Sequence, residues 1–124
     1  MTAAAGTSPS DGPSPTTASL DQLTVVVDHA ASPPTISLAG ELDPHTAPLL
    51  QQEIDGVLGN GGTDLVLDLS QLGFVDSSGL RVLIAAQHQL GDLGGTLALR
   101  APSETVRRLL EITGLIDHVT ITDT

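Results

Sequence analysis

The run of residues 64–69, Asp-Leu-Val-Leu-Asp-Leu, constrains the fold of this chain more than any other feature. It is almost continuously apolar, which is typical of a strand that is buried on both faces of a sheet. Such strands belong to parallel sheets, in which neighbouring strands are joined by right-handed crossovers through a helix. A domain built around this strand therefore needs helical segments before and after it.

Apolar residues recur at helical spacing on both sides of the run. Three segments predict helices, namely residues 46–58, 77–90 and 103–113. The last of them has Ser103 as a predicted N-cap and Gly114 as the residue that ends it. The central strand therefore has the flanking helices that a parallel arrangement requires.

Further strands are predicted by β-branched residues and by alternation of polar and apolar side chains. They are residues 24–27, 35–42, 96–100 and 119–121, and the first two form a hairpin. The order of the elements is β-β-α-β-α-β-α-(β). It predicts a small α/β domain with helices packed on a mixed sheet of four to five strands.

The amino-terminal segment differs in composition from the rest of the chain. Residues 1–19 are rich in Ser, Thr, Pro and Ala and show no apolar periodicity, so we predict a disordered tail. The folded domain is predicted to comprise residues 20–124.

Charge and composition exclude several classes of function. The chain contains 15 acidic residues, four arginines and no lysine, which gives a formal net charge of −11. Nucleic acids and anionic membranes are therefore poor partners, whereas a basic protein surface is a suitable one. The chain has no cysteine, and its four histidines show no metal-ligand spacing, so neither a metal nor a cofactor is expected. Without a leader sequence or a long apolar run, the chain is expected to be cytoplasmic.

Two loops are predicted to meet at one edge of the sheet, where the parallel strands end. One consists of residues 42–46 and the other of residues 73–79, and the loop at residues 100–103 is expected to join them. Sites in α/β proteins are commonly built at this edge.

The second loop opens directly into a helix with Asp76-Ser77-Ser78-Gly79-Leu80. From the pattern alone, the run Asp76-Ser77-Ser78 indicates a helix cap, because Asp and Ser are favoured N-cap residues. A phosphate at this position would equally be favoured by the unpaired N–H groups and the dipole of the helix terminus. Arg81 lies four residues after Ser77 and so shares its helical face.

Two segments resemble the signatures of STAS-domain anti-sigma factor antagonists. The first is Gly-Glu-Leu-Asp-Pro-His-Thr-Ala at residues 40–47. The second is Leu-Val-Leu-Asp-Leu-Ser at residues 65–70, followed by Phe-Val-Asp-Ser-Ser-Gly-Leu at residues 74–80. The resemblance covers about residues 20–122, and the two signatures have the separation that is usual in the family.

This resemblance implies a partner-switching mechanism. The unphosphorylated protein would bind an anti-sigma factor with a histidine-kinase-like ATPase fold and so release a sigma factor in a bacterial stress response. That partner would phosphorylate the serine after the motif aspartate, here Ser77, and dissociate from it, and a PP2C-type phosphatase would reverse the step. The chain would then be a substrate of enzymes and not itself an enzyme.

The resemblance also implies a set of residues that bind the partner. They are Asp43, His45, Thr46, Asp76, Ser78, Gly79, Leu80 and Arg81. Within this set we expect Ser78 to cap the helix, Asp76 to orient the loop and Gly79 to allow close approach of the partner's backbone. Arg81 is a departure, because founding members of the family often carry a small residue there. We therefore expect Arg81 to contact the Ser77 phosphate or an acidic surface of the partner.

Two alternatives remain open from the sequence. STAS domains also serve as accessory or regulatory subunits of transporter complexes, although an intact serine motif favours the switch. A hydrolase with Ser77, His45 and Asp43 as its triad has the right residue types. The elbow pattern Gly-x-Ser-x-Gly is absent around Ser77, however, and so are the glycine-rich phosphate-binding motifs.

Overall fold

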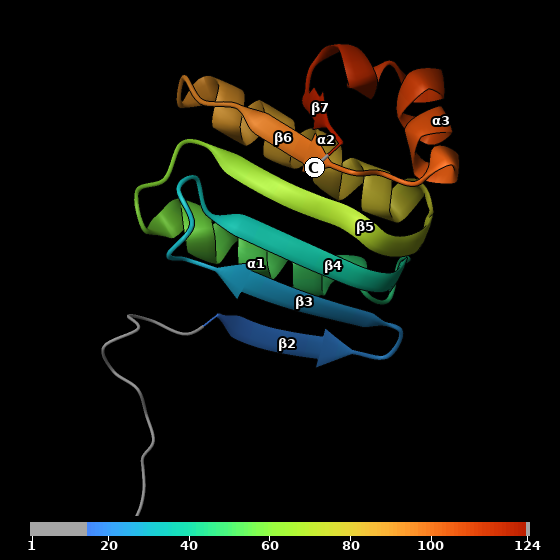
Figure 1. Cartoon of the computed structure of the whole chain (residues 1–124), viewed down its shortest axis with the longest axis horizontal. Helices are drawn as coiled ribbons and strands as arrows, with labels where there is room; N and C mark the ends of the chain where they lie inside the picture. Colours follow the sequence, from blue (N-terminus) through green and yellow to red (C-terminus); the bar gives the residue numbers. More distant parts are fainter. Residues whose placement is uncertain (1–14, 124) are drawn as a thin grey trace, which may run out of the picture.

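The structure, a computed structural model, describes residues 15–123. Its centre is a six-stranded sheet in the order β2-β3-β4-β5-β6-β7 (Figure 1). The strands are β2 (Thr16–Leu20), β3 (Leu23–Asp28), β4 (Thr35–Leu42), β5 (Leu65–Val75), β6 (Leu97–Arg100) and β7 (Thr120–Thr122). The pairs β2–β3 and β3–β4 are antiparallel, and every pair from β4 to β7 is parallel. The mixed sheet of an α/β domain is thereby confirmed.

The helices are α1 (Ala47–Gly59), α2 (Ser77–Asp92), α3 (Glu104–Thr113) and the short 3-10 helix η2 (Leu115–Asp117). Helices α1 and α2 contact each other and lie behind the sheet in Figure 1. Helix α3 packs against β5 and η2. The sheet therefore has one face that is covered by the first two helices.

The hydrophobic core lies between this face and the helices. The strand registers align Val27, Ile36, Leu67 and Leu99 in one row across four strands, and all four side chains are buried. Leu50, Ile54, Leu83 and Leu90 of α1 and α2 are buried with them. Aliphatic side chains thus build the core, as the near absence of aromatic residues requires.

The sheet begins earlier in the chain than predicted. The strand β2 occupies Thr16–Leu20, where we expected the end of the tail, so six strands replace the predicted four to five. None of its side chains is buried, and its hydrogen bonds to β3 hold it in place. A strand without a buried face has no apolar alternation from which to predict it. The rest of the predicted tail, residues 1–14, lies outside the described residues.

The predicted helices are confirmed with small shifts of their ends. Helix α2 begins at Ser77 as predicted, and α3 has the predicted caps. Ser103 Oγ accepts a hydrogen bond from the N–H of Val106 at 3.2 Å. Gly114 has a φ of +80°, the left-handed conformation in which helices commonly end.

The strand β5 extends beyond its predicted end at residue 69 and reaches Val75. Its pairing with β4 contains two register shifts, and these break the alternation from which strands are predicted. The strand β6 ends where Arg100 pairs with Asp68, well before Val75. The paired part of β6 thus ends seven residues before the end of β5, and a place for the loop at residues 100–103 beside the other two loops stays a prediction.

Candidate partner-binding site

The ends of β4 and β5 lie side by side, as predicted. Leu42 pairs with Val75, and the N–H of Asp76 donates to the carbonyl of Leu42 at 3.1 Å. The loop that leads into α1 and the start of α2 therefore meet at one edge of the sheet. This edge contains the residues that we predicted to bind a partner.

Asp76 is the N-cap of α2. Its Oδ1 accepts hydrogen bonds from the N–H groups of Ser78 at 2.8 Å and Gly79 at 3.1 Å, and its backbone is extended. We expected Ser78 to be the cap, but Ser78 lies within the first turn. Asp76 is the better N-cap residue here, because its carboxylate accepts hydrogen bonds from two amide groups and carries the negative charge that a helix N-terminus favours.

Ser77 is the first residue of α2, and its side chain is exposed. Among residues 15–123, its hydroxyl forms no hydrogen bond with another side chain or with the backbone. The hydroxyl is therefore accessible to an enzyme from outside and contributes little to the fold.

Asp43 organises the loop before α1. Its Oδ1 accepts hydrogen bonds from the N–H groups of His45 and Thr46, both at 2.9 Å, and lies 3.1 Å from Thr46 Oγ1. The N–H of Asp43 donates in return to Thr46 Oγ1 at 2.9 Å. Thr46 is buried and is the N-cap residue of α1, but its side chain makes no capping bond. This network therefore fixes the loop instead of capping the helix.

These contacts lower the pKa of the Asp43 carboxyl below its ordinary value. The largest cause is the hydrogen bond from the backbone N–H of Thr46, which stabilises the carboxylate. Partial burial opposes the change, while the Thr46 hydroxyl, the N–H of His45 and the charge of His45 add to it. Asp43 is therefore an anion at neutral pH.

The side chains of His45 and Asp21 are in contact, with 2.6 Å between His45 Nε2 and Asp21 Oδ2, and they form an ion pair when the imidazole is protonated. Asp21 lies in the turn between β2 and β3, which the sequence did not connect with the site. The same turn comes close to Gly40, where a Cβ atom would collide with the carbonyl of Gln22. The His45 imidazole thus contacts Asp21, and the structure does not assemble the triad of Ser77, His45 and Asp43.

Gly79 is buried and packs within its own chain. A Cβ atom there would lie 2.6 Å from Leu42 Cδ2 and 3.0 Å from Val75 Cγ1. We expected this glycine to allow close approach of a partner, but it allows α2 to approach the ends of β4 and β5. Leu80 is also buried. The buried residues of the predicted set therefore support the two loops from the interior of the protein; they are Thr46, Gly79 and Leu80.

The predicted residues that reach the surface are His45 and Arg81, with Asp43, Asp76 and Ser78 partly exposed. In the part of the chain that the structure describes, Arg81 belongs to none of the ion pairs. Sequence reasoning missed Asp21, Glu41 and Phe74, which are exposed at or next to this edge. The signal for Phe74 was its rarity, since it is the only aromatic residue of the chain.

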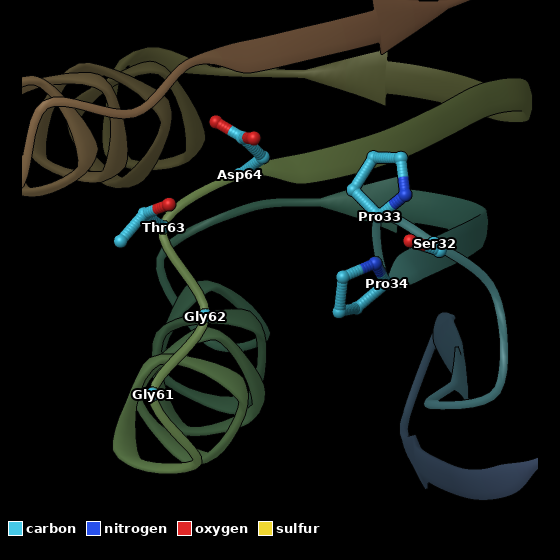
Figure 2. A pocket seen from close by; sticks show the side chains of 7 residues that line it. All are labelled: Ser32, Pro33, Pro34, Gly61, Gly62, Thr63 and Asp64. Atoms are coloured by element: carbon cyan, nitrogen blue, oxygen red, sulfur yellow. The ribbon is translucent and has the colours of Figure 1, made fainter.

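Two hollows lie away from this edge. The first, of about 340 Å³, is lined by residues 32–34 and 61–64 at the opposite edge of the sheet (Figure 2). Its carboxylate, Asp64, is engaged with the N–H of Thr96 at 2.8 Å. The second, of about 280 Å³, lies between α2 and the segment from Thr113 to His118. Residues 15–123 contain no group of three potential metal ligands, and none of their helices is long and apolar enough to cross a membrane.

Comparison with known proteins gives a consistent result. The family described as "Mlab, STAS domain" matches residues 25–121. The anti-sigma-B factor antagonist of Bacillus subtilis is 36% identical over 86 residues, which cover 69% of this chain and 78% of that protein.

Solved structures agree with this relationship. A crystal structure of an anti-sigma factor antagonist from Mycobacterium paratuberculosis has a TM-score of 0.70 and 33% identity, and the match covers 86% of this chain and 90% of that one. The Bacillus cell fate determinant SpoIIAA, solved in its phosphorylated form, has a TM-score of 0.66 and 25% identity, with 80% and 91% of the two chains covered.

Proposed function

Since this chain belongs to the STAS domain family of anti-sigma factor antagonists, we propose that its unphosphorylated form binds an anti-sigma factor and thereby releases a sigma factor. That partner is a serine kinase with a histidine-kinase-like ATPase fold, and it ends the interaction by phosphorylating Ser77. A PP2C-type phosphatase restores the binding form. The protein is a substrate of both enzymes, needs no cofactor, and acts in the cytoplasm in a stress response.

The position of Ser77 carries this proposal. Its exposed hydroxyl stands at the start of α2, next to a carboxylate that already occupies the N–H groups of Ser78 and Gly79. A phosphate on Ser77 would find these two donors taken and would extend outward. Its nearly two negative charges would then act on the partner more than on the fold of this chain.

Desolvation explains how such a phosphate would dissociate the complex. A tightly packed contact at Ser77 excludes water, and a dianion within it is costly to bury. The carboxylates of Asp43 and Asp76 follow the two strand ends at the site and would repel the phosphate. The same carboxylates attract a basic surface before phosphorylation, because complementary charge accelerates encounter.

Arg81 is the cation of this surface, and we propose that it contacts the Ser77 phosphate or an acidic group of the partner. It is exposed and lies one helical turn after Ser77, within reach of a group on that residue. We compare Arg81→Ala with Arg108→Ala, since Arg108 is exposed on α3 and serves as a control. Unchanged affinity and unchanged phosphorylation rate in Arg81→Ala would contradict the assignment.

The first experiment is mass spectrometry of the protein purified from its native host, with Ser77→Ala beside it. We expect a phosphate on the peptide that contains Ser77, and its loss in the variant. Failure to find a phosphate under any growth condition would contradict the switch and leave Ser77 as a residue of the helix start.

A pulldown from the same host identifies the partner. We expect the unphosphorylated protein to retain an anti-sigma factor with a kinase fold. Capture of a transporter ATPase in its place would replace the proposal by the alternative of an accessory subunit. A generic ester substrate tests the enzyme alternative, because turnover that disappears in Ser77→Ala would overturn a purely regulatory role.

A further inference from the structure

A register shift near the end of β5 turns Phe74 outward. Gly40 pairs with Leu72 and Glu41 pairs with Phe74, so Gly73 is an extra residue of β5 at this point. If the pairing continued from Gly40 and Leu72 without this register shift, Phe74 would lie opposite Leu42, whose side chain is fully buried. With it, Val75 takes the buried position opposite Leu42, and Phe74 lies on the other side of the strand.

This arrangement exposes the one side chain that could contribute most to the core. Phe74 is the only aromatic residue of the chain, and 48% of it is exposed. An aromatic ring carries a large apolar surface, and leaving it in water forgoes much of the benefit of burying it. Bulges next to functional sites are known to re-aim side chains in this way. The exposure of Phe74 is thus built into the strand pairing.

Acidic residues lie beside Phe74 in the strand pairing and directly after the two strand ends. Glu41, its partner in the ladder, is exposed, and in the described part of the chain it belongs to none of the ion pairs. Asp43 and Asp76 follow directly on the two strand ends, and Ser77 is three residues beyond Phe74. An apolar ring bordered by carboxylates complements an apolar pocket bordered by Lys or Arg.

We infer that Phe74 is the apolar anchor of this surface and enters a pocket of the anti-sigma factor that is rimmed by basic side chains, which meet Glu41 and Asp43. The inference rests on the proposed function and deepens it. Insertion of the ring draws the partner onto the neighbouring Ser77 and excludes water from that contact. A phosphate on Ser77 is disruptive because the anchor holds the partner so close.

The single phenylalanine makes a direct test possible. Protein labelled throughout with 4-fluorophenylalanine carries one fluorine, so its ¹⁹F NMR spectrum contains one signal, that of residue 74. We expect a soluble paramagnetic agent to broaden this signal in the free protein, and the anti-sigma factor to shift it and protect it. A signal that stays unshifted and accessible in the saturated complex would overturn the inference.

Affinity measurements give a second test with a matched control. Phe74→Ala is expected to weaken binding about thirty-fold, as truncation of an aromatic hot spot does. Leu93→Ala is the control, since Leu93 is 53% exposed but follows the far end of α2. Circular dichroism verifies that both variants fold. Equal affinities for the two variants would refute the anchor.

The basic rim proposed for the partner's pocket is tested separately, by the substitution Glu41→Gln in this chain. We expect slower association at low salt and a smaller difference at high salt, because exposed charges steer encounter and are screened. An association rate without salt dependence in either protein would contradict the basic rim. If the unmodified chain binds but Phe74→Ala binds equally well, the inference fails and the proposed function stands. If the unmodified chain binds no anti-sigma factor, both fail.

Discussion

The imidazole of His45 and the carboxylate of Asp21 lie 2.6 Å apart and join two turns that are distant in the sequence. Asp21 belongs to the tight turn between β2 and β3, where its φ is +50°. His45 belongs to the loop between β4 and α1, which Asp43 and Thr46 hold from within. The pair thus connects the edge hairpin to one of the two loops of the site.

We predict a small effect on stability when this pair is removed. Asp21→Asn eliminates the charge, while asparagine tolerates the left-handed conformation of the turn. Both side chains are well exposed, so the free energy of unfolding should fall by less than about 1 kcal/mol. Urea denaturation measures this, with Asp123→Asn as a control that breaks the exposed pair to Arg107. A loss of several kcal/mol would mean that the pair holds the hairpin in place.

Gly79→Ala should destabilise the fold, because the added methyl group would lie 2.6 Å from Leu42 Cδ2 and 2.7 Å from Leu42 Cγ. Overpacking of this kind costs about 1–3 kcal/mol. Gly91→Ala, near the end of the same helix, meets nothing closer than Gln87 Nε2 at 3.7 Å. Since alanine favours helix over glycine, this control should be neutral or stabilising. Thermal unfolding of both variants gives the comparison, and similar melting temperatures would contradict it.

Two substitutions of Asp76 separate the effect of its capping hydrogen bonds from the effect of its negative charge. Asp76→Ala removes the acceptor for the N–H groups of Ser78 and Gly79 and should cost about 1 kcal/mol. Asp76→Asn keeps an oxygen in place and should retain most of that stability. If both variants are equally stable in chemical denaturation, the hydrogen bonds of Asp76 do not stabilise the helix start.

Acid should weaken the fold partly through Asp43. The hydrogen bond from the Thr46 N–H depresses the pKa of Asp43 in the folded state. A depressed folded pKa contributes stability above the unfolded value of about 3.9, and this is lost as pH falls through the folded pKa. The unmodified protein should therefore lose more stability than Asp43→Asn as the pH falls below the unfolded value. Parallel pH dependences of the two unfolding free energies would contradict this role.

Much of the fold could be predicted from local sequence patterns. The buried run of β5, the helical spacing of α1 to α3 and the caps Ser103 and Gly114 all act over a few residues. The edge strand β2 was missed because its pairing with β3 holds it, without a buried face. Composition alone made this segment resemble a tail.

The site was predicted less completely for a similar reason. The meeting of the two loops follows from parallel strands, and the structure confirms it through the bond from Asp76 N–H to the Leu42 carbonyl. The choice of Asp76 over Ser78 as cap depends on geometry that one pattern of residues does not decide. The outward turn of Phe74 depends on the register between β4 and β5, which no local pattern encodes.

The course of β2 has a practical consequence for handling the protein. The strand runs from Thr16, opposite Val27, toward Asp21 beside His45. Its first residue therefore lies at the end of the sheet that is opposite to the site (Figure 1). Because the chain lacks cysteine, Thr16→Cys would provide a unique attachment point at an exposed position. A sensor surface or a dye coupled there leaves the Ser77 edge facing the solution, with every molecule held in the same orientation.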